Sequence, residues 1–326
     1  MYIMDYRIRI GEKVIPLMSS VKIIKDVTKL TDTATVICPA VVNGRSLSFT
    51  KDVSRWMPVT IELGYNGKLE KEFEGYVDKV TTSDGRIRIE CADALLNFKK
   101  VRVPDGEMKS PRLKDVLDRI VGEVNKHNQD PLKVECKYDY GYDKYTFHNC
   151  TAYDVIDKVQ KEGNPNIYVK DGTLHVEPPY TNSEGSAVYS MQDNIRKDGL
   201  KLKWKEEKDN PTKVIVTATG KDGSEVKGTY GEDGGNEVKM SMKGKMSVED
   251  VRKIAESIYR QKVYTGYEGS FGAWLVPFCD AGYTVDVRDK SNVIRGGRYW
   301  VSRVEVEMSS AGASRQVYIG CALRGV

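Results

Sequence analysis

The stretch VTIELGY at residues 59–65 alternates apolar and polar side chains, and YTVDVRD at residues 283–289 repeats that pattern at an offset of 224. The same offset, without a gap, places YVDKV at 76–80 over WVSRV at 300–304. The identical pairs are Thr60 with Thr284, Val77 with Val301 and Val80 with Val304. Period-two alternation over about four to eight residues is typical of half-buried strands. The repeat therefore predicts two copies of one small β-barrel.

Short strands and tight turns fill the chain around both copies. Alternation predicts strands at 2–10 and 87–91 and, later in the chain, at 200–205, 214–218, 283–288, 298–308 and 315–323. Asn-Gly at 43–44 and 66–67 and Asp-Gly at 84–85 predict turns, because Asn, Asp and Gly tolerate positive φ. The segment GTYGEDGGNE at 228–237 is expected to be a loop. Many short strands joined by such turns predict a mainly β fold.

Between the two β regions the apolar spacing changes to that of helices. Helices are predicted near 111–126, with Ser110 as its cap, near 152–162, with Thr151 as its cap, and later near 248–262. A tyrosine-rich strand is expected at 138–142 and a hairpin at 167–176. We therefore expect an α+β chain: a first tube-like β-barrel domain at 1–103, a small α/β domain at 104–180 and a second tube-like β-barrel domain at 181–326.

Composition limits the classes of function. Of 326 residues, 51 are Lys or Arg and 47 are Asp or Glu, so the net charge is only +4 and gives little support to a nucleic-acid binder. No run approaches the ~20 apolar residues that a membrane-spanning helix requires. The opening MYIMDYRIRIG mixes charged with apolar residues, so no signal peptide is predicted.

No motif for catalysis or for a metal is present. The three histidines, His127, His148 and His175, form no metal-binding spacing, and His148 with Cys150 supplies only two ligands. The six cysteines include no C-x-x-C pair, and Cys91 and Cys321 fall on apolar strand faces, so both are expected to be buried thiols. We predict no catalytic, cofactor-binding or metal-binding residue and no cofactor.

One aromatic stretch stands apart from the regular patterns. Residues 263–278, VYTGYEGSFGAWLVPF, lack strand alternation and are expected to form a long loop. Aromatic side chains are enriched at interface cores. The predicted interface residues are Tyr264, Tyr267, Phe271, Trp274 and Phe278. Burial under the chain's own domain is the alternative.

Three segments together resemble a known family. They are FEGYVDKVTTSDGRIRIECAD at 73–93, YTFHNCTAYDVIDKV at 145–159 and the closing run that contains YWVSRVEVEMS at 299–309. The chain resembles the hub proteins of contractile phage-tail baseplates, the late control protein D family, to which the hub part of type VI secretion spike proteins is related. The resemblance implies a homotrimer in which two barrels per chain form a ring of six.

The same resemblance implies where the chain acts. Such a ring adapts a sixfold tail tube to a threefold spike, so the implied partners are the spike, the tail tube and other baseplate proteins. The implied location is the virion tail baseplate, assembled in the bacterial cytoplasm, and the family has no active site in this part. Two alternatives stay open: a cell-wall carbohydrate-binding protein, with the tyrosines at 138–145 stacking on sugars, and a wall hydrolase.

Overall fold

The computed structural model describes residues 3–42, 45–46, 53–127, 131–138, 140–163, 165–178, 185–209, 212–220, 222–244 and 246–323. The chain is mainly β, with 53% strand and 18% helix, which confirms the predicted class. It divides into two compact units: unit 1 is 1–96, 183–202 and 269–319, and unit 2 is 97–182, 203–268 and 320–326. The predicted domain boundaries and the tandem barrels stay predictions. The predicted turn at 43–44 lies outside the described residues.

The first half of the unit 1 sheet is antiparallel throughout. Its strands are β1 (Met4–Ile10), β2 (Lys13–Val14), β3 (Ser20–Asp26), β4 (Thr33–Pro39), β7 (Pro58–Tyr65), β8 (Lys68–Ser83) and β9 (Arg86–Ala92), in the order β3-β4-β9-β8-β7-β1-β2. The predicted turns at Asn66-Gly67 and Asp84-Gly85 are present, each with positive φ at both residues. Two further short strands, β5 (Val41–Val42) and β6 (Arg45–Ser46), pair with each other.

The second half of the sheet repeats this order. Its strands are β15 (Ser186–Ser190), β16 (Ile195–Lys205), β20 (Gly266–Ala273), β21 (Thr284–Arg288), β22 (Gly297–Ser309) and β23 (Gly312–Ala322). They follow the order β16-β20-β23-β22-β21-β15, which matches β3-β4-β9-β8-β7-β1 strand for strand. The outermost pair differs, because β15 runs parallel to β21 whereas β1 runs antiparallel to β7. The repeat predicted from sequence therefore corresponds to a repeat of topology.

The residue register of the two copies differs by two. Tyr76 lies opposite Pro58, whereas Trp300 lies opposite Thr284. A constant offset of 224 would have placed Tyr76 opposite Thr60. That offset superposes Val59 on Tyr283 and Tyr76 on Trp300, and the observed register does not allow both superpositions at once. The first hairpin contains an irregularity between Ile61 and Glu62. A shift of two residues keeps each side chain on its own face, so the buried pattern survives.

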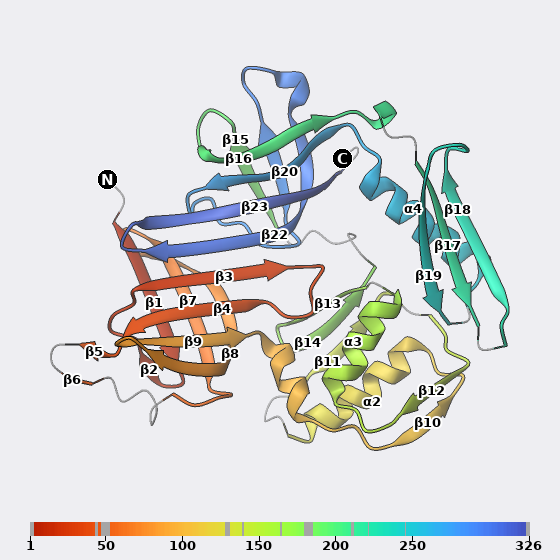
Figure 1. The fold of residues 1–326 in the computed structure, drawn as a ribbon, viewed down its shortest axis with the longest axis horizontal. Helices are drawn as coiled ribbons and strands as arrows, with labels where there is room; N and C mark the ends of the chain where they lie inside the picture. The colour runs from red at the N-terminus through yellow and green to blue at the C-terminus, as the bar shows by residue number, and fades with distance from the viewer. Residues whose placement is uncertain are drawn as a thin grey trace. The chain divides into compact units, whose positions relative to one another are not determined.

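A single strand pair joins the two halves. β3 and β22 are antiparallel, with Ser20 opposite Ser309 and Asp26 opposite Arg303. Figure 1 shows the resulting order from β16 through β20, β23 and β22 to β3, β4 and β9. Val21 and Ile23 of β3 and Val304 and Val306 of β22 are buried there. The two copies are thus halves of one continuous sheet.

In unit 2, a first group of elements contains two of the predicted helices, α2 (Leu113–Asn125) and α3 (Ala152–Gly163). Thr151 is the predicted cap of α3, and it forms a capping box with Asp154. The cap of α2 was predicted wrongly: Arg112, not Ser110, precedes the helix, and its amide donates to Asp115 at 2.8 Å. The strands are β10 (Gly106–Lys109), β11 (Lys133–Cys136), β12 (Lys144–Phe147), β13 (Asn166–Lys170) and β14 (Thr173–Glu177), the last two forming the predicted hairpin.

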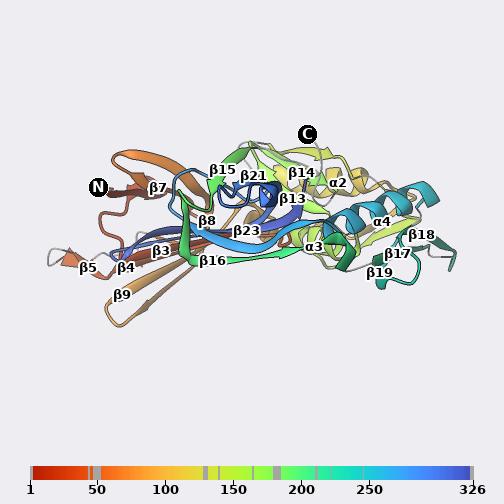
Figure 2. The same ribbon diagram turned by 90° about the horizontal axis from the view of Figure 1, so that it is seen from above.

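A second group in unit 2 is a three-stranded sheet with one helix. The strands β17 (Thr212–Thr219), β18 (Glu225–Gly231) and β19 (Asn236–Lys243) follow the order β18-β17-β19, and α4 (Val248–Lys262) covers one face in both views (Figures 1 and 2). Gly228 lets α4 approach closely, since a Cβ there would lie 2.6 Å from the Arg252 nitrogen. The loop expected at 228–237 is wrong in extent, because both of its ends belong to strands.

Short 3-10 helices complete the described elements: η1 (Ala94–Lys100), η2 (Glu207–Asp209) and η3 (Val293–Arg295). η1 buries Leu95, Leu96 and Phe98. Within the described residues, no helix combines the length and apolar character needed to cross a bilayer.

Candidate assembly interface

The histidines do not gather into a reactive centre. His148 is largely exposed, and its Nδ1 lies 2.9 Å from Asp105 Oδ2. His175 stacks on Tyr168, with ring centroids 4.9 Å apart. In the described part of the chain, no three His, Cys, Asp or Glu residues lie close enough together to hold a metal ion.

The tyrosines at 138–145 form a packed column rather than a sugar-binding surface. Tyr138, Tyr140, Tyr142 and Tyr145 are all buried, and each ring contacts the next at centroid distances of 5.0–5.7 Å. Burial raises the pKa of Tyr140 to about 12, although a hydrogen bond with the Tyr142 hydroxyl opposes that rise. The strand predicted at 138–142 is wrong for the described residues of that range, which lie between β11 and β12 and belong to neither. These rings are core, and they give the carbohydrate alternative no exposed stacking platform.

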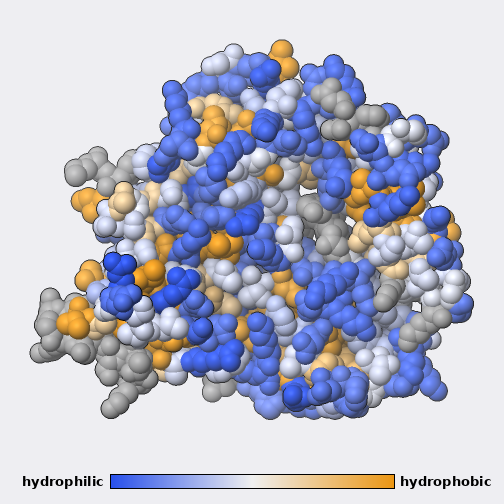
Figure 3. Space-filling model, viewed as in Figure 1, coloured by the Kyte–Doolittle hydropathy of each residue, from blue (hydrophilic) through white to orange (hydrophobic). Residues whose placement is uncertain are grey.

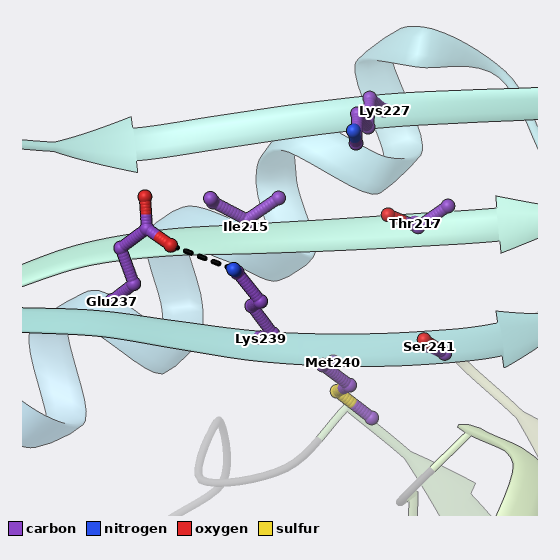
Figure 4. Close-up of a pocket in the computed structure, with 7 residues that line it drawn as sticks. All are labelled: Ile215, Thr217, Lys227, Glu237, Lys239, Met240 and Ser241. Atoms are coloured by element: carbon purple, nitrogen blue, oxygen red, sulfur yellow. Dashed lines mark ion pairs between the residues drawn. The ribbon is translucent and has the colours of Figure 1, made fainter.

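A polar hollow of about 430 Å³ lies on the three-stranded sheet of unit 2 (Figure 4). Its lining residues come from all three strands and are Ile215, Thr217, Lys227, Glu237, Lys239, Met240 and Ser241. Glu237 and Lys239 form an ion pair at 2.8 Å, and both side chains are largely exposed. The Glu237 carboxylate in this hollow is therefore paired with a lysine and open to solvent.

The aromatic stretch is a strand followed by a short irregular segment. β20 covers Gly266–Ala273, so the predicted long loop is wrong over these residues. β20 pairs with β23, and a Cβ at Gly272 would lie 3.0 Å from the Gly199 Cα of β16. Close strand approach at glycine, with burial on both sides of the strand, explains why no simple alternation marks it.

The five predicted interface aromatics have different environments. Tyr264, Tyr267 and Phe271 are buried: the Tyr264 hydroxyl donates to the Gly320 carbonyl, Tyr267 packs edge-on against Trp204, and Phe271 against Tyr189. Phe278 is half-buried, with its ring 5.9 Å from that of Tyr283. Trp274 is 45% exposed. Among the five, Trp274 is therefore the residue best placed to contact another chain.

Arg315 of β23 anchors the segment that follows Trp274. Its guanidinium donates to the carbonyls of Leu275, at 3.3 Å, and of Cys279. It also donates to Glu72 Oε1 of β8 at 2.6 Å, and both side chains are 1% exposed. Phe278 covers the guanidinium, whose carbon lies 5.0 Å from the ring centre. Period-two alternation places Arg315 on the same buried face of β23 as Val317, Ile319 and Cys321. What sequence reasoning missed is its partner Glu72, which lies on a distant strand.

Exposed apolar side chains accompany Trp274 on unit 1. Arg196 of β16 stacks on the Trp274 ring at 4.6 Å, Val276 is exposed, and Leu200 of β16 is 42% exposed. Figure 3 shows apolar surface among polar side chains in the region that β15 and β16 occupy in Figure 1. Exposed apolar residues that cluster on one surface are typical of contact sites. The surface that carries Trp274, Val276 and the exposed residues of β16 is thus the candidate assembly interface.

Comparison of sequences finds no relative, since no protein-family model and no curated protein matches the chain. Comparison of structures does. A tail protein from Neisseria meningitidis MC58 has a TM-score of 0.63 at 14% identity, over 97% of this chain and 96% of that chain. The 43 kDa tail protein of prophage MuSo2 from Shewanella oneidensis has a TM-score of 0.64 at 12% identity, over 97% and 98%.

A third structural match is a component of a secretion system. An Escherichia coli component of the type VI secretion system, itself described as structurally similar to T4 bacteriophage tail proteins, has a TM-score of 0.60 at 6% identity, over 98% of this chain and 76% of that chain. The chain therefore has the fold shared by phage tail proteins and this secretion component. The fold agrees with the resemblance to baseplate hub proteins that the sequence indicates.

Proposed function

We propose that this chain is a structural hub subunit of a phage tail baseplate or of a related contractile injection device. Three copies form a ring that adapts the sixfold tail tube to the threefold spike. The chain acts by assembly, and the proposal assigns it no catalytic residue. The partners are further copies of itself, the spike, the tail tube and neighbouring baseplate proteins.

One observation carries the proposal: each chain contains the same strand order twice. β3-β4-β9-β8-β7-β1 and β16-β20-β23-β22-β21-β15 are two copies of one arrangement within a single sheet. A ring of three subunits, each with two similar halves, contains six similar halves. Such a trimer therefore matches a sixfold neighbour. The structural likeness to tail proteins supports the same role.

The test is the mass of the assembly in solution. The full chain, alone and co-expressed with the spike and tail-tube genes that neighbour its own, is measured by light scattering coupled to size exclusion. We expect a trimer of the 36.7 kDa chain, about 110 kDa, that binds the spike protein. A stable dimer, or no association with spike or tube subunits at micromolar concentration, would refute the hub role.

A further inference from the structure

Within one chain, the first and second halves of the sheet are joined by a single strand pair. β3, at the edge of the first half, pairs with the far end of β22 in the second half, so that Val21 lies opposite Met308 and Ile23 opposite Val306. The near end of β22 pairs with β21. By the shared strand order, β16 is the counterpart of β3, and β8 is the counterpart of β22. The counterpart junction would therefore join β16 to the far end of β8.

The β16 side of that junction has a free edge. β16 pairs with β20, and no described strand pairs with its other side. The Lys201 carbonyl faces β20, because a Cβ on Gly269 would lie 2.2 Å from it. Backbone groups alternate in direction along a strand, so the amides of Leu200 and Leu202 face the open side. An open strand edge is a template for pairing with another chain.

On the β8 side of that junction, one edge of the strand is also free. β7 accompanies β8 as far as Tyr76, and the Met57 carbonyl then accepts from the Val77 amide. From Lys79 to Ser83, β9 pairs with one side of β8, and the other side has no strand partner among the described residues. Ser83 and Arg86 flank a two-residue turn and face each other, so the Thr82 amide faces the open side.

Side-chain burial agrees with a missing neighbour at both edges. In the occupied junction Val21 is 1% exposed and Ile23 is 0% exposed. On the unoccupied β16, Leu200 is 42% exposed and Leu202 is partly exposed. Likewise Val304 of β22 is buried, whereas Val80 of β8, its match in the repeat, is only partly buried. Pairing of β16 with a strand would cover these apolar side chains as β22 covers those of β3.

We propose that β16 of one copy adds to the Lys79–Ser83 end of β8 in the next copy, antiparallel, and so forms the contact between subunits. The occupant is a second copy of this chain, because the chain carries both the donor edge and the acceptor edge and already shows the same junction internally. This proposal rests on the ring proposed above and specifies the contact that closes it. The contact is head-to-tail, and a head-to-tail contact that closes yields a ring.

The charges along the two edges fit this pairing. Lysines flank the leucines of β16, at Lys197, Lys201 and Lys203, and edge lysines discourage indiscriminate strand pairing. The acceptor end of β8 begins with Lys79 and otherwise carries the uncharged residues Val80, Thr81, Thr82 and Ser83, followed by Asp84. The acceptor therefore presents hydroxyl groups and a carboxylate to the lysine-bearing donor.

Two proline variants test the contact. Leu200→Pro removes an outward amide on β16, and Thr82→Pro removes one on β8; proline is tolerated where the N–H faces away from the sheet. Val14→Pro is the matched control: Val14 is exposed on edge strand β2, and the neighbouring Ile15 amide, not that of Val14, faces β1. Circular dichroism and urea unfolding of each variant confirm the fold. Leu200→Asp, which leaves the backbone intact, is the second β16 variant.

Light scattering then separates the outcomes. We expect wild type and Val14→Pro to be trimers, and Leu200→Pro, Leu200→Asp and Thr82→Pro each to be monomers. A one-to-one mixture of Leu200→Pro and Thr82→Pro retains one intact junction and should stop at a heterodimer of about 73 kDa, two chains of 36.7 kDa. Hydrogen exchange should show the Leu200, Leu202 and Thr82 amides protected only in the trimer.

Failure of this contact and failure of the ring give different results. If folded Leu200→Pro and Leu200→Asp remain trimers, β16 is not the contact, although the ring proposal stands. If wild type is monomeric with and without its spike protein, the ring itself is wrong. Protection of the Leu200 amide in the monomer would also overturn the contact, because the edge would then be occupied within one chain.

Discussion

Glu72 and Arg315 form a fully buried ion pair that links the two halves of the sheet, with Glu72 Oε1 2.6 Å from Arg315 Nη2. Glu72 lies on β8 and Arg315 on β23. Burial raises the pKa of Glu72, although the charges of Arg315 and Lys25 oppose that rise. Removing one partner of such a pair leaves an uncompensated buried charge, whereas replacing both with apolar residues is often tolerated.

We therefore expect Glu72→Leu alone to lower the free energy of unfolding by about 3–5 kcal/mol. The double variant Glu72→Leu/Arg315→Met should recover much of that loss in urea unfolding monitored by fluorescence. The exposed pair Arg55–Asp78 supplies the control, and Asp78→Asn should change stability by less than about 1 kcal/mol. Equal losses in the single and double variants would show that the pair contributes through packing and not through its charges.

A second prediction concerns pH. Burial raises the pKa of Asp32 to about 6 from its ordinary 3.8, although Lys25 nearby and the Asp26 amide oppose the rise; Asp280 and Asp26 add to it. A raised carboxyl pKa means that the folded state binds the proton more tightly, so stability falls as pH rises from about 4 to above 6. Asp32→Asn keeps the oxygen that accepts from the Asp26 amide and removes this titration.

The variant should therefore gain stability relative to wild type across that interval, by about 1–3 kcal/mol at neutral pH. Urea unfolding in a pH series measures the difference. Asp84→Asn, in an exposed turn, is the control. A constant difference between Asp32→Asn and wild type from pH 4 to pH 7 would contradict the assignment.

Thiol reactivity gives a third prediction. Burial raises the pKa of Cys38 to about 11 and the pKa values of Cys91 and Cys279 to about 12, so these thiols stay protonated and inaccessible at pH 8. Cys136 and Cys150 are partly exposed and should be alkylated first. Peptide mapping by mass spectrometry after brief iodoacetamide treatment tests this order. Rapid native-state labelling of Cys91 would show that its strand is open.

A fourth prediction separates the two environments within the aromatic stretch. Trp274→Ala should leave unfolding nearly unchanged, because the ring is half exposed, but should weaken assembly. Phe271→Ala, at a fully buried ring packed on Tyr189, should cost about 3–5 kcal/mol in stability. Light scattering and urea unfolding are measured on both variants. If Trp274→Ala unfolds the monomer, the segment after β20 is core and not an interface.

Local chemistry explains what could be predicted from the sequence. The helices at 113–125, 152–163 and 248–262 follow from apolar spacing, and the second also from its cap Thr151. The Asp84-Gly85 turn follows from the tolerance of both residues for positive φ. The repeat was visible because strand alternation on the two copies uses similar residues. Cys91 and Cys321 are buried, as the apolar face of their strands predicts.

What the sequence did not reveal depends on distant contacts. β20 was predicted as a loop because its glycines interrupt the strand pattern. Those glycines are required by the close approach of β16, which lies some seventy residues earlier in the chain. The partner of Arg315 is Glu72, on a strand of the other half. The junction of β3 with β22, and with it the free edge of β16, exists only once both halves have folded together.

The pairing of β3 with β22 also means that β3 cannot complete its folding until most of the chain has been synthesised. Residue 20 meets residue 309, so the ribosome must add roughly 280 residues before β3 finds its partner. The first half is complete when β9 ends at Ala92, roughly 200 residues before β22 begins. At about 5–20 residues per second, it therefore exposes that strand edge for roughly 10–40 s. Val21 and Ile23 are buried in the folded protein, but during this interval they are exposed and can contact other nascent chains on the same messenger RNA. A truncated product that ends before β22 would keep the edge exposed permanently, so premature termination would yield an aggregation-prone fragment instead of a smaller working subunit.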